Sequence, residues 1–250
     1  MGWLRNVRGN FAALAALALA SLLGAPSVRA AMPVIAAASD LKFALEEIAA
    51  TFERERSQSV KLSFGSSGTF ATQIRNGAPF DLYLSADEDY VQALAADGLT
   101  RDAGVLYAIG RIVLMAPHTS SMPVDSQLRG VAAELKAGRI TRFAIANPEH
   151  APYGRRAEEA LRHAGLWDLI KPKLVLGENV SQAAQFATSG SAAGGIIALS
   201  LAMSPQMKDQ GRYAPIPADW HTPLRQRMVL LRRAGESAEA VSLRRADELE

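Results

Sequence analysis

The sequence predicts an α/β fold of two lobes, each a mostly parallel sheet flanked by helices. Short apolar runs alternate with amphipathic stretches along the chain, the pattern of strands that alternate with helices. Segments rich in serine, glycine and proline stand between these runs, and no repeat at fixed spacing follows residue 30. The number of expected elements favours two small sheets, although the pattern alone also permits one doubly wound sheet.

The first part of the predicted fold is a parallel β-α-β-α-β unit. Residues 34–38 are a short apolar run, and residues 60–64 alternate between apolar and polar as a half-buried strand does. Apolar side chains recur at three- and four-residue steps over residues 40–56, which predicts an amphipathic helix. The expected strands are 34–38, 60–64 and 81–85, and the expected helices are 40–56, 69–75 and 88–97.

The second part starts with the apolar run 111–116, which stops at Pro117. Further strands are expected at 142–146, 173–176, 195–198 and 226–231, and helices at 155–164, 181–189 and 199–207. This division places the first lobe at residues 31–110 and 232–250, and the second lobe at residues 111–231.

Residues 1–30 have the features of an export signal. They contain a positively charged start, an apolar run at 11–23 and small residues before the junction of Ala30 and Ala31. The alternative is an uncleaved anchor, but the apolar run is shorter than the roughly 20 residues that span a bilayer. We therefore expect cleavage near Ala30 and a mature protein that is free in the periplasm. The chain has no cysteine, which excludes a lipid-modified cysteine, a disulfide and a thiolate metal site.

The charge balance argues against a nucleic-acid-binding protein. The whole chain has 27 Lys and Arg against 25 Asp and Glu, a net charge of +2. Three of the arginines lie in residues 1–30 with no acidic residue, so the remainder has 24 basic and 25 acidic residues and a net charge of −1. Nucleic-acid binders carry a basic surface that this remainder lacks.

Candidate binding residues lie where expected strands meet expected helices, because open α/β sheets bind ligands at the carboxyl ends of strands. Ser39 and Ser67 both stand at such junctions, beside the positive end of a helix. The alternative is that each serine caps its own helix. Residues 147–154 form another junction, constrained by two prolines, and Asn179 stands at a fourth, where it is also a candidate cap.

Catalytic sites find little support. Ser67 is followed at once by glycine, so it lacks the Gly-x-Ser-x-Gly pattern of a nucleophile elbow. The chain has no phosphate-binding glycine motif, and its histidines do not pair at metal-ligand spacing. The histidines are His118, His150, His163 and His221. A periplasmic hydrolase that uses Ser67 or the pair Glu149 and His150 remains the alternative to a binding protein.

At these junctions the chain resembles the periplasmic molybdate-binding proteins, the substrate-binding components of ABC importers for molybdate and tungstate. Five segments carry the resemblance, in the same order and spacing, across residues 34–231. They are Ala36-Ala37-Ala38-Ser39-Asp40-Leu41, Phe64-Gly65-Ser66-Ser67-Gly68-Thr69, the segment 77–87, the segment 147–154 and Gly177-Glu178-Asn179-Val180.

The resemblance implies a type II periplasmic binding fold with a hinge between its lobes. Ser39 and Ser67 would bind the oxyanion through their hydroxyls, and Tyr153 and Val180 through backbone N–H groups. In some members of the family a tyrosine hydroxyl also binds the oxyanion. The aligned position here is Ala198, so this contact is missing or is replaced by another residue, for which Tyr153 is the candidate. The family usually ends in a hydrophobic helix, whereas residues 232–250 are mostly charged or small.

Its further implications concern ligand and partners. The ligand would be molybdate or tungstate, with no cofactor and no direct ligand to the metal atom. The partner would be a membrane permease, and the protein would act as a monomer without enzymatic activity. No Lys or Arg stands in the four junction segments, so we expect neutral hydrogen bonding and an affinity that depends little on any titrating group nearby. Another oxyanion, such as sulfate, is the alternative ligand.

Overall fold

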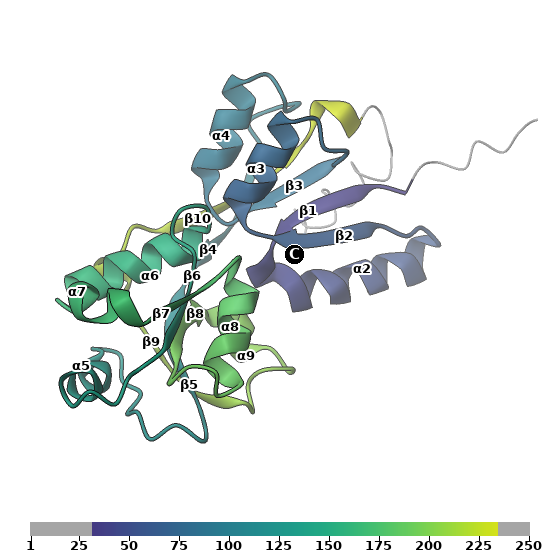
Figure 1. The fold of residues 1–250 in the computed structure, drawn as a ribbon. Helices are drawn as coiled ribbons and strands as arrows, with labels where there is room; N and C mark the ends of the chain where they lie inside the picture. The colour runs from purple at the N-terminus through teal and green to yellow at the C-terminus, as the bar shows by residue number, and fades with distance from the viewer. Residues whose placement is uncertain (1–31, 235–250) are drawn as a thin grey trace, which may run out of the picture. The chain divides into compact units, whose positions relative to one another are not determined.

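The computed structural model describes residues 32–234, all of which lie within one compact unit. These residues form two five-stranded sheets, with strand orders β2-β1-β3-β10-β4 and β7-β6-β8-β5-β9 (Figure 1). We call each sheet with its helices a lobe, the first and the second in chain order. The prediction of two α/β lobes is confirmed, and the signal segment 1–30 and the tail 235–250 lie outside the described residues.

The first lobe begins with the parallel unit that the sequence predicts. Side chains alternate across its sheet, so Ile35 and Ala37 pack with Phe52 of α2, whereas Ala36 packs with Phe70 and Leu94 of α3 and α4. Helix α2 therefore covers one face, and α3 and α4 cover the other (Figure 1). The elements are β1 (Val34–Ala38), η1 (Ser39–Leu41), α2 (Lys42–Arg56), β2 (Lys61–Gly65), α3 (Ser67–Arg75), β3 (Leu82–Ser85) and α4 (Glu88–Ala96).

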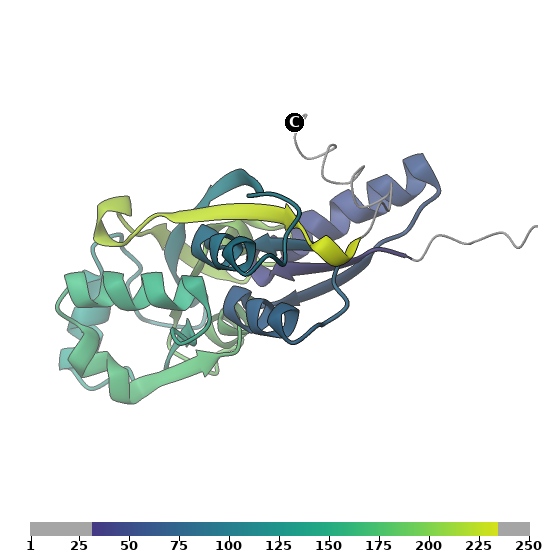
Figure 2. The same cartoon turned by 90° about the horizontal axis from the view of Figure 1, so that it is seen from above.

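The last strand, β10 (Leu224–Leu230), completes the first lobe, which corrects the predicted second-lobe range of 111–231 at its C-terminal end. β10 pairs antiparallel with β3 and with β4 (Val105–Gly110), an edge strand that we did not predict. Met228 packs in the core under α2 and Val229 in the core under α3 and α4, so this strand fills both apolar layers of the first lobe. Figure 2 shows β10 as the long yellow-green strand.

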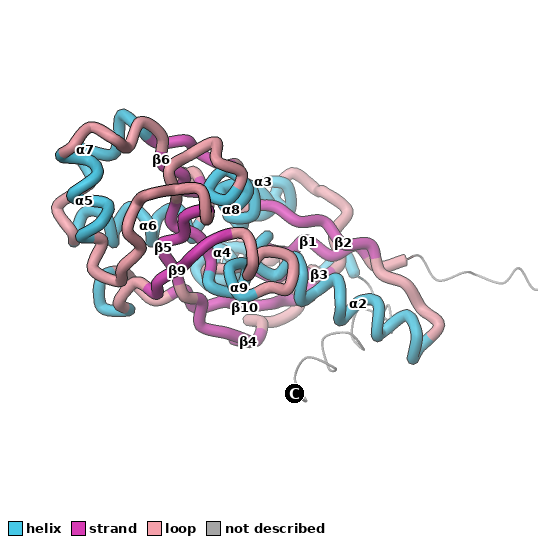
Figure 3. The backbone as a smooth tube through the Cα atoms, turned by 90° about the horizontal axis from the view of Figure 1, so that it is seen from below, coloured by secondary structure: helices cyan, strands magenta, loops and turns pink. Residues whose placement is uncertain are grey.

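The second lobe has parallel strands β6, β7 and β8, whereas β5 runs antiparallel to β8 and β9. Figure 3 shows β5 beside β9 here, and β4 beside β10 in the first lobe. We did not predict α5, α7 or the edge strand β9. The elements are β5 (Ile112–Pro117), α5 (Arg129–Lys136), β6 (Phe143–Ala146), α6 (Pro152–His163), α7 (Trp167–Ile170), η2 (Lys171–Lys173), β7 (Leu174–Gly177), α8 (Val180–Thr188), β8 (Gly195–Ala198), α9 (Leu199–Met203) and β9 (Gly211–Pro215).

The chain crosses between the lobes twice. It leaves the first lobe between β4 and β5, next to Gly110, and returns between β9 and β10 through η3 (Ala218–Trp220). The described chain ends in η4 (Arg232–Ala234). Within residues 32–234, no helix combines the length and the apolar character that crossing a membrane requires.

Candidate functional site

The four predicted binding residues line one small cavity. Ser39 and Ser67 reach it from the first lobe, and Tyr153 and Val180 reach it from the second. The cavity measures about 10 Å³, close to the smallest volume that holds a water-sized group. The other lining residues are Ala38, Asp40, Gly65, Ser66, Ala86, Ala151 and Pro152. The lining contains no Lys, Arg or His.

Three helices begin at this cavity. Ser67 is the first residue of α3, Pro152 the first of α6 and Val180 the first of α8. The first N–H groups of a helix have no partner within the helix and form its positive end. Because Pro152 has no N–H, Tyr153 supplies the first one of α6. The cavity is therefore surrounded by backbone donors that favour a negative charge.

Neither predicted serine caps its own helix, so the capping alternative is wrong for both. The N-cap of α3 is Ser66, whose Oγ accepts a hydrogen bond from the amide of Thr69 at 3.3 Å. Ser67 is fully buried, and its Oγ accepts from the amide of Ala86 at 2.9 Å. This bond uses the oxygen as an acceptor, which leaves the hydroxyl proton of Ser67 to be donated.

Ser39 makes the same kind of bond, but across the lobes. Its Oγ accepts from the amide of Ser181 at 3.1 Å, near the start of α8. The Ser181 hydroxyl in turn donates to the carbonyl oxygen of Ser39 at 2.7 Å. Asn179 is the N-cap of α8, since its Oδ1 accepts from the amide of Gln182 at 3.1 Å. Because the Ser39 oxygen accepts the hydrogen bond from the Ser181 amide, the Ser39 hydroxyl proton, like that of Ser67, is left to be donated to another group.

A buried polar network, which the sequence did not reveal as a unit, adjoins the cavity. The Tyr153 hydroxyl donates to Oδ2 of Asp40 at 2.9 Å, and Nε2 of Gln226 donates to the same oxygen at 2.7 Å. Burial raises the pKa of the Asp40 carboxyl above its ordinary value, and burial together with the nearby Asp40 raises the pKa of the Tyr153 hydroxyl. Ala198 is buried and has no hydroxyl. The hydroxyl of Tyr153, the candidate replacement, donates to Asp40 within this network.

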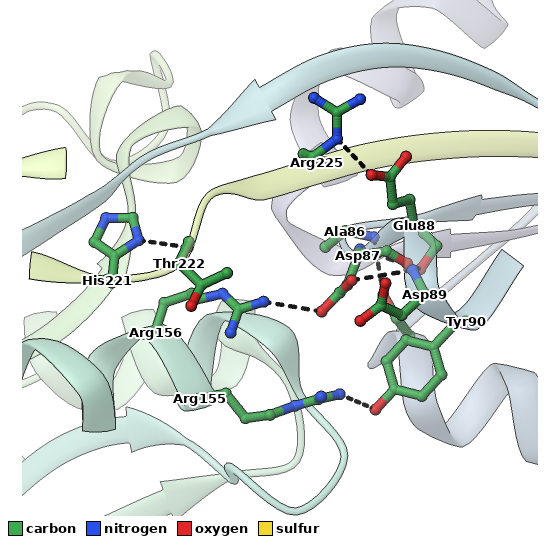
Figure 4. A network of polar contacts seen from close by, with 12 residues as sticks. Ala86, Asp87, Glu88, Asp89, Tyr90, Arg155, Arg156, His221, Thr222 and Arg225 are labelled. Carbon is green, nitrogen blue, oxygen red and sulfur yellow. Dashed lines mark hydrogen bonds and ion pairs between the residues drawn. The ribbon is translucent and has the colours of Figure 1, made fainter. Parts of the chain in front are cut away.

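Ion pairs and hydrogen bonds also join the lobes outside the cavity. Arg156 of α6 pairs with Asp87 of the first lobe at 3.1 Å, and both side chains are buried. Arg155 donates to the Tyr90 hydroxyl (Figure 4). The amide of Gly68 donates to the carbonyl oxygen of His150 at 2.9 Å. The arginines next to the cavity are therefore engaged with side chains of the first lobe.

The alternative catalytic pairs are not assembled. Ser67 Oγ has its contact with Ala86 rather than with a histidine. Glu149 contacts Asn147, whereas the His150 ring lies 2.8 Å from Oγ of Ser66, the helix-capping serine. The carboxylate nearest His150 is that of Glu178, at 3.6 Å and with 78% of its side chain exposed.

The other histidines lie apart from the cavity. His163 stacks on Trp220 with ring centroids 4.6 Å apart, and Nδ1 of His221 lies 2.8 Å from the carbonyl oxygen of Thr222. His118 is exposed. Among residues 32–234 there is no cluster of three or more His, Asp or Glu that could hold a metal ion.

Known proteins match this chain over most of its length. A family model described as bacterial extracellular solute-binding protein matches residues 33–246. The molybdate-binding protein ModA of Azotobacter vinelandii is 35% identical over 228 residues, which cover 91% of this chain and 88% of that protein. ModA of Rhodobacter capsulatus is 37% identical over 227 residues, covering 90% and 86%.

A solved structure agrees with the sequence matches. The periplasmic molybdate-binding protein of Azotobacter vinelandii superposes with a TM-score of 0.78 at 30% identity, covering 86% of this chain and 92% of that one. The matches therefore agree with the order of junction segments and with the two-lobed fold. The chain belongs to the family of bacterial extracellular solute-binding proteins and is a homologue of the molybdate-binding proteins ModA.

Proposed function

We propose that this protein captures molybdate, and tungstate in the same way, between its two lobes and delivers it to an ABC importer. The observation that carries the proposal is that Ser39, Ser67, Tyr153 and Val180 line one small cavity that has no cationic side chain. The similarity to the ModA proteins of two bacteria supports the choice of oxyanion.

The donors around the cavity match what an oxyanion needs. The two serine hydroxyls would each donate their free proton, and the amides of Tyr153 and Val180 would donate from helix N-termini. A hydrogen bond to a charged group contributes about 1.5–3 kcal/mol. Because removing an ion from water costs far more than one such bond returns, the anion needs a nearly complete set of donors, which two lobes closing from opposite sides would supply.

Neutral donors would also explain selectivity. With no Lys or Arg lining the cavity, the anion would be held by the spacing of hydrogen bonds rather than by charge attraction. A set of donors spaced for molybdate would make long, weak bonds to the smaller sulfate ion. Sulfate is the alternative ligand, and a competition titration separates the two.

The remaining features of the proposal concern location and assembly. The protein would be exported by the signal at residues 1–30, cleaved near Ala30 and free in the periplasm as a monomer. It would bind without turnover and release the anion to a membrane permease. The membership of an extracellular solute-binding family supports this transport role.

The test is isothermal titration of the protein, expressed with its own leader and purified from the periplasm. Molybdate and tungstate are expected to bind tightly with 1:1 stoichiometry, and sulfate and phosphate weakly. N-terminal sequencing of the purified protein checks cleavage, and light scattering with and without ligand checks the monomer. Tight binding of sulfate together with weak binding of molybdate would show that sulfate, and not molybdate, is the ligand. Hydrolysis of an ester by the wild type that is lost in Ser67→Ala would show that the protein is a hydrolase and not a binding protein.

A further inference from the structure

Asp40 is a buried carboxyl group in the wall of the same cavity. It follows Ser39 directly, and only 4% of it is exposed to solvent. Its Oδ2 accepts hydrogen bonds from the Tyr153 hydroxyl and from Nε2 of Gln226. Its Oδ1 is buried and has no hydrogen-bond partner among residues 32–234. Oδ2 thus accepts two hydrogen bonds, whereas Oδ1 is buried and accepts none from the described residues.

The surroundings of Asp40 provide no cation for an ionised carboxylate. From α6 Asp40 faces the Tyr153 phenol, and from β10 it faces the neutral amide of Gln226. The Ser200 hydroxyl of α9 donates to the backbone carbonyl of Asp40. The Tyr107 phenol of β4 interacts electrostatically with Tyr153. A groove on the other side of Asp40 is lined by the acidic side chains Glu46 and Glu47 of α2, and Lys42 of that helix pairs with Glu46.

The nearby arginines are engaged elsewhere. Arg156 pairs with Asp87 and Glu159, and Arg155 with the Tyr90 hydroxyl. A buried carboxylate without a cation is costly and tends to take up a proton. An oxyanion in the cavity would add further negative charge beside it. The environment therefore favours the neutral acid, consistent with the raised pKa of this carboxyl group.

The network also lies where the lobes are connected. A side chain at Gly110, next to the crossing between β4 and β5, would come within 2.6 Å of the Tyr153 hydroxyl and 2.9 Å of Nε2 of Gln226. Asp40 belongs to the first lobe and Tyr153 to the second. Separation of the lobes would break their hydrogen bond and admit water, which returns the carboxyl group to its ordinary ionised state above about pH 4.

We propose that Asp40 takes up one proton from solvent when the lobes close on the oxyanion and returns it when they open, so that anion capture is coupled to protonation. The proton would reside on Oδ1, since Oδ2 already accepts two hydrogen bonds. The neutral acid removes the charge repulsion between Asp40 and the anion. This inference rests on the proposed function, and it replaces the expectation that affinity depends little on a titrating group.

The experiment is isothermal titration with molybdate at pH 6.0 in two buffers whose ionisation enthalpies differ, repeated from pH 5.5 to 8.5. Uptake of up to one proton per anion is expected, seen as a buffer-dependent heat, and the dissociation constant rises with pH by at most about tenfold per pH unit. In Asp40→Asn, whose amide resembles the neutral acid, the heat loses its dependence on buffer, and binding at pH 8 is tighter than in the wild type.

The control is His150→Gln, because the His150 ring contacts Ser66 at the cavity and is the nearby side chain to be tested as another source of the proton. Proton uptake that persists in His150→Gln supports Asp40, and uptake that disappears there overturns the inference. So does molybdate binding with a buffer-independent heat in the wild type, which leaves the proposed function intact. Absence of binding of molybdate, tungstate and sulfate overturns both. If Asp40→Asn does not fold, as seen by thermal unfolding, the wild type and His150→Gln still decide.

Discussion

The backbone amide of Gly68 in α3 donates a hydrogen bond of 2.9 Å to the carbonyl oxygen of His150, in the loop before α6. The bond joins the lobes at the rim of the cavity. A Cβ atom at position 68 would lie 2.6 Å from that oxygen and 2.7 Å from the Tyr90 hydroxyl. Glycine is therefore required here by the close approach of His150 from the other lobe and of Tyr90 from its own lobe, rather than by backbone conformation.

Gly68→Ala is expected to weaken molybdate binding at least tenfold, because the added methyl group keeps the lobes from closing fully. Stability without ligand should change little, since alanine favours the helix and the first-lobe atom that the methyl group meets is the far end of the Tyr90 side chain, whereas the backbone clash is with His150 of the other lobe. Titration calorimetry and thermal unfolding with and without molybdate measure the two effects. Gln73→Ala, at an exposed position of the same helix, serves as the control. Wild-type affinity in Gly68→Ala would show that binding does not need this approach.

Ser39→Ala and Ser67→Ala should each reduce the free energy of molybdate binding by about 1–3 kcal/mol, the cost of losing one hydrogen bond to a charged group. Each serine oxygen already accepts from an amide, which directs its proton away from that amide. Calorimetric titration of both variants measures the loss. Ser191→Ala, at an exposed position, should bind as the wild type does. Unchanged affinity in Ser39→Ala or Ser67→Ala would remove that serine from the proposed site.

The buried ion pair of Asp87 and Arg156 predicts a large effect on stability. Only 6% and 9% of the two side chains are exposed, so Arg156→Met would leave Asp87 buried without its cation. Breaking a buried pair in this way costs about 3–5 kcal/mol. Urea-induced unfolding should show this loss, and adding Asp87→Asn should recover part of it.

The matched control for this pair lies on the surface. Arg75 and Asp97 are paired at 2.8 Å, but 42% and 46% of their side chains are exposed. Arg75→Met should therefore cost at most about 1 kcal/mol. An equal cost for Arg75→Met and Arg156→Met would mean that burial of the pair between the lobes adds nothing.

The predicted strands and junction residues could be found from the sequence because they depend on local patterns. Apolar runs identify β1, β3 and β6, and a hydroxyl between a strand and a helix marks Ser39 and Ser67. Which oxygen atom caps a helix depends on one residue of register. The structure gives this role to Ser66, so the pattern found the right turn, and only the capping alternative for Ser67 is wrong.

The network around Asp40 could not be found in this way. Asp40 is separated by 113 residues from Tyr153 and by 186 from Gln226, and no local pattern links them. Gln226 lies in a strand that the sequence predicts as an apolar run of the second lobe. The structure pairs this strand with β3 and β4 of the first lobe, and the sequence could not show this because an apolar run does not specify which strands it pairs with. The edge strands β4 and β9 were not predicted, whereas the edge strands β2 and β7 were, so an edge position alone does not hide a strand from sequence patterns.

Glu88 predicts a pH-dependent contribution to stability in the first lobe. Its Oε2 accepts from Nη2 and Nε of Arg227 at 2.8 and 3.1 Å, and its Oε1 accepts from Arg225. These arginines hold the pKa of the Glu88 carboxyl below its usual value. The folded protein thus favours the ionised form, so the stabilisation is present above the ordinary pKa of about 4.3 and is lost as pH falls through the lower pKa of the folded state.

Glu88→Gln should therefore lower the free energy of unfolding at pH 7 by roughly 1 kcal/mol, a modest value because Arg225 and Arg227 are partly solvated. The difference from the wild type should shrink as the pH falls below about 4, and it should vanish once the pH lies below the lower pKa of the folded state, where Glu88 is protonated in both states. Urea-induced unfolding at pH 7 and at pH 3 measures it, with Glu55→Gln as a control for loss of a charge at an exposed position of α2. A difference that is equal at both pH values would mean that Glu88 acts through its shape and not through its charge.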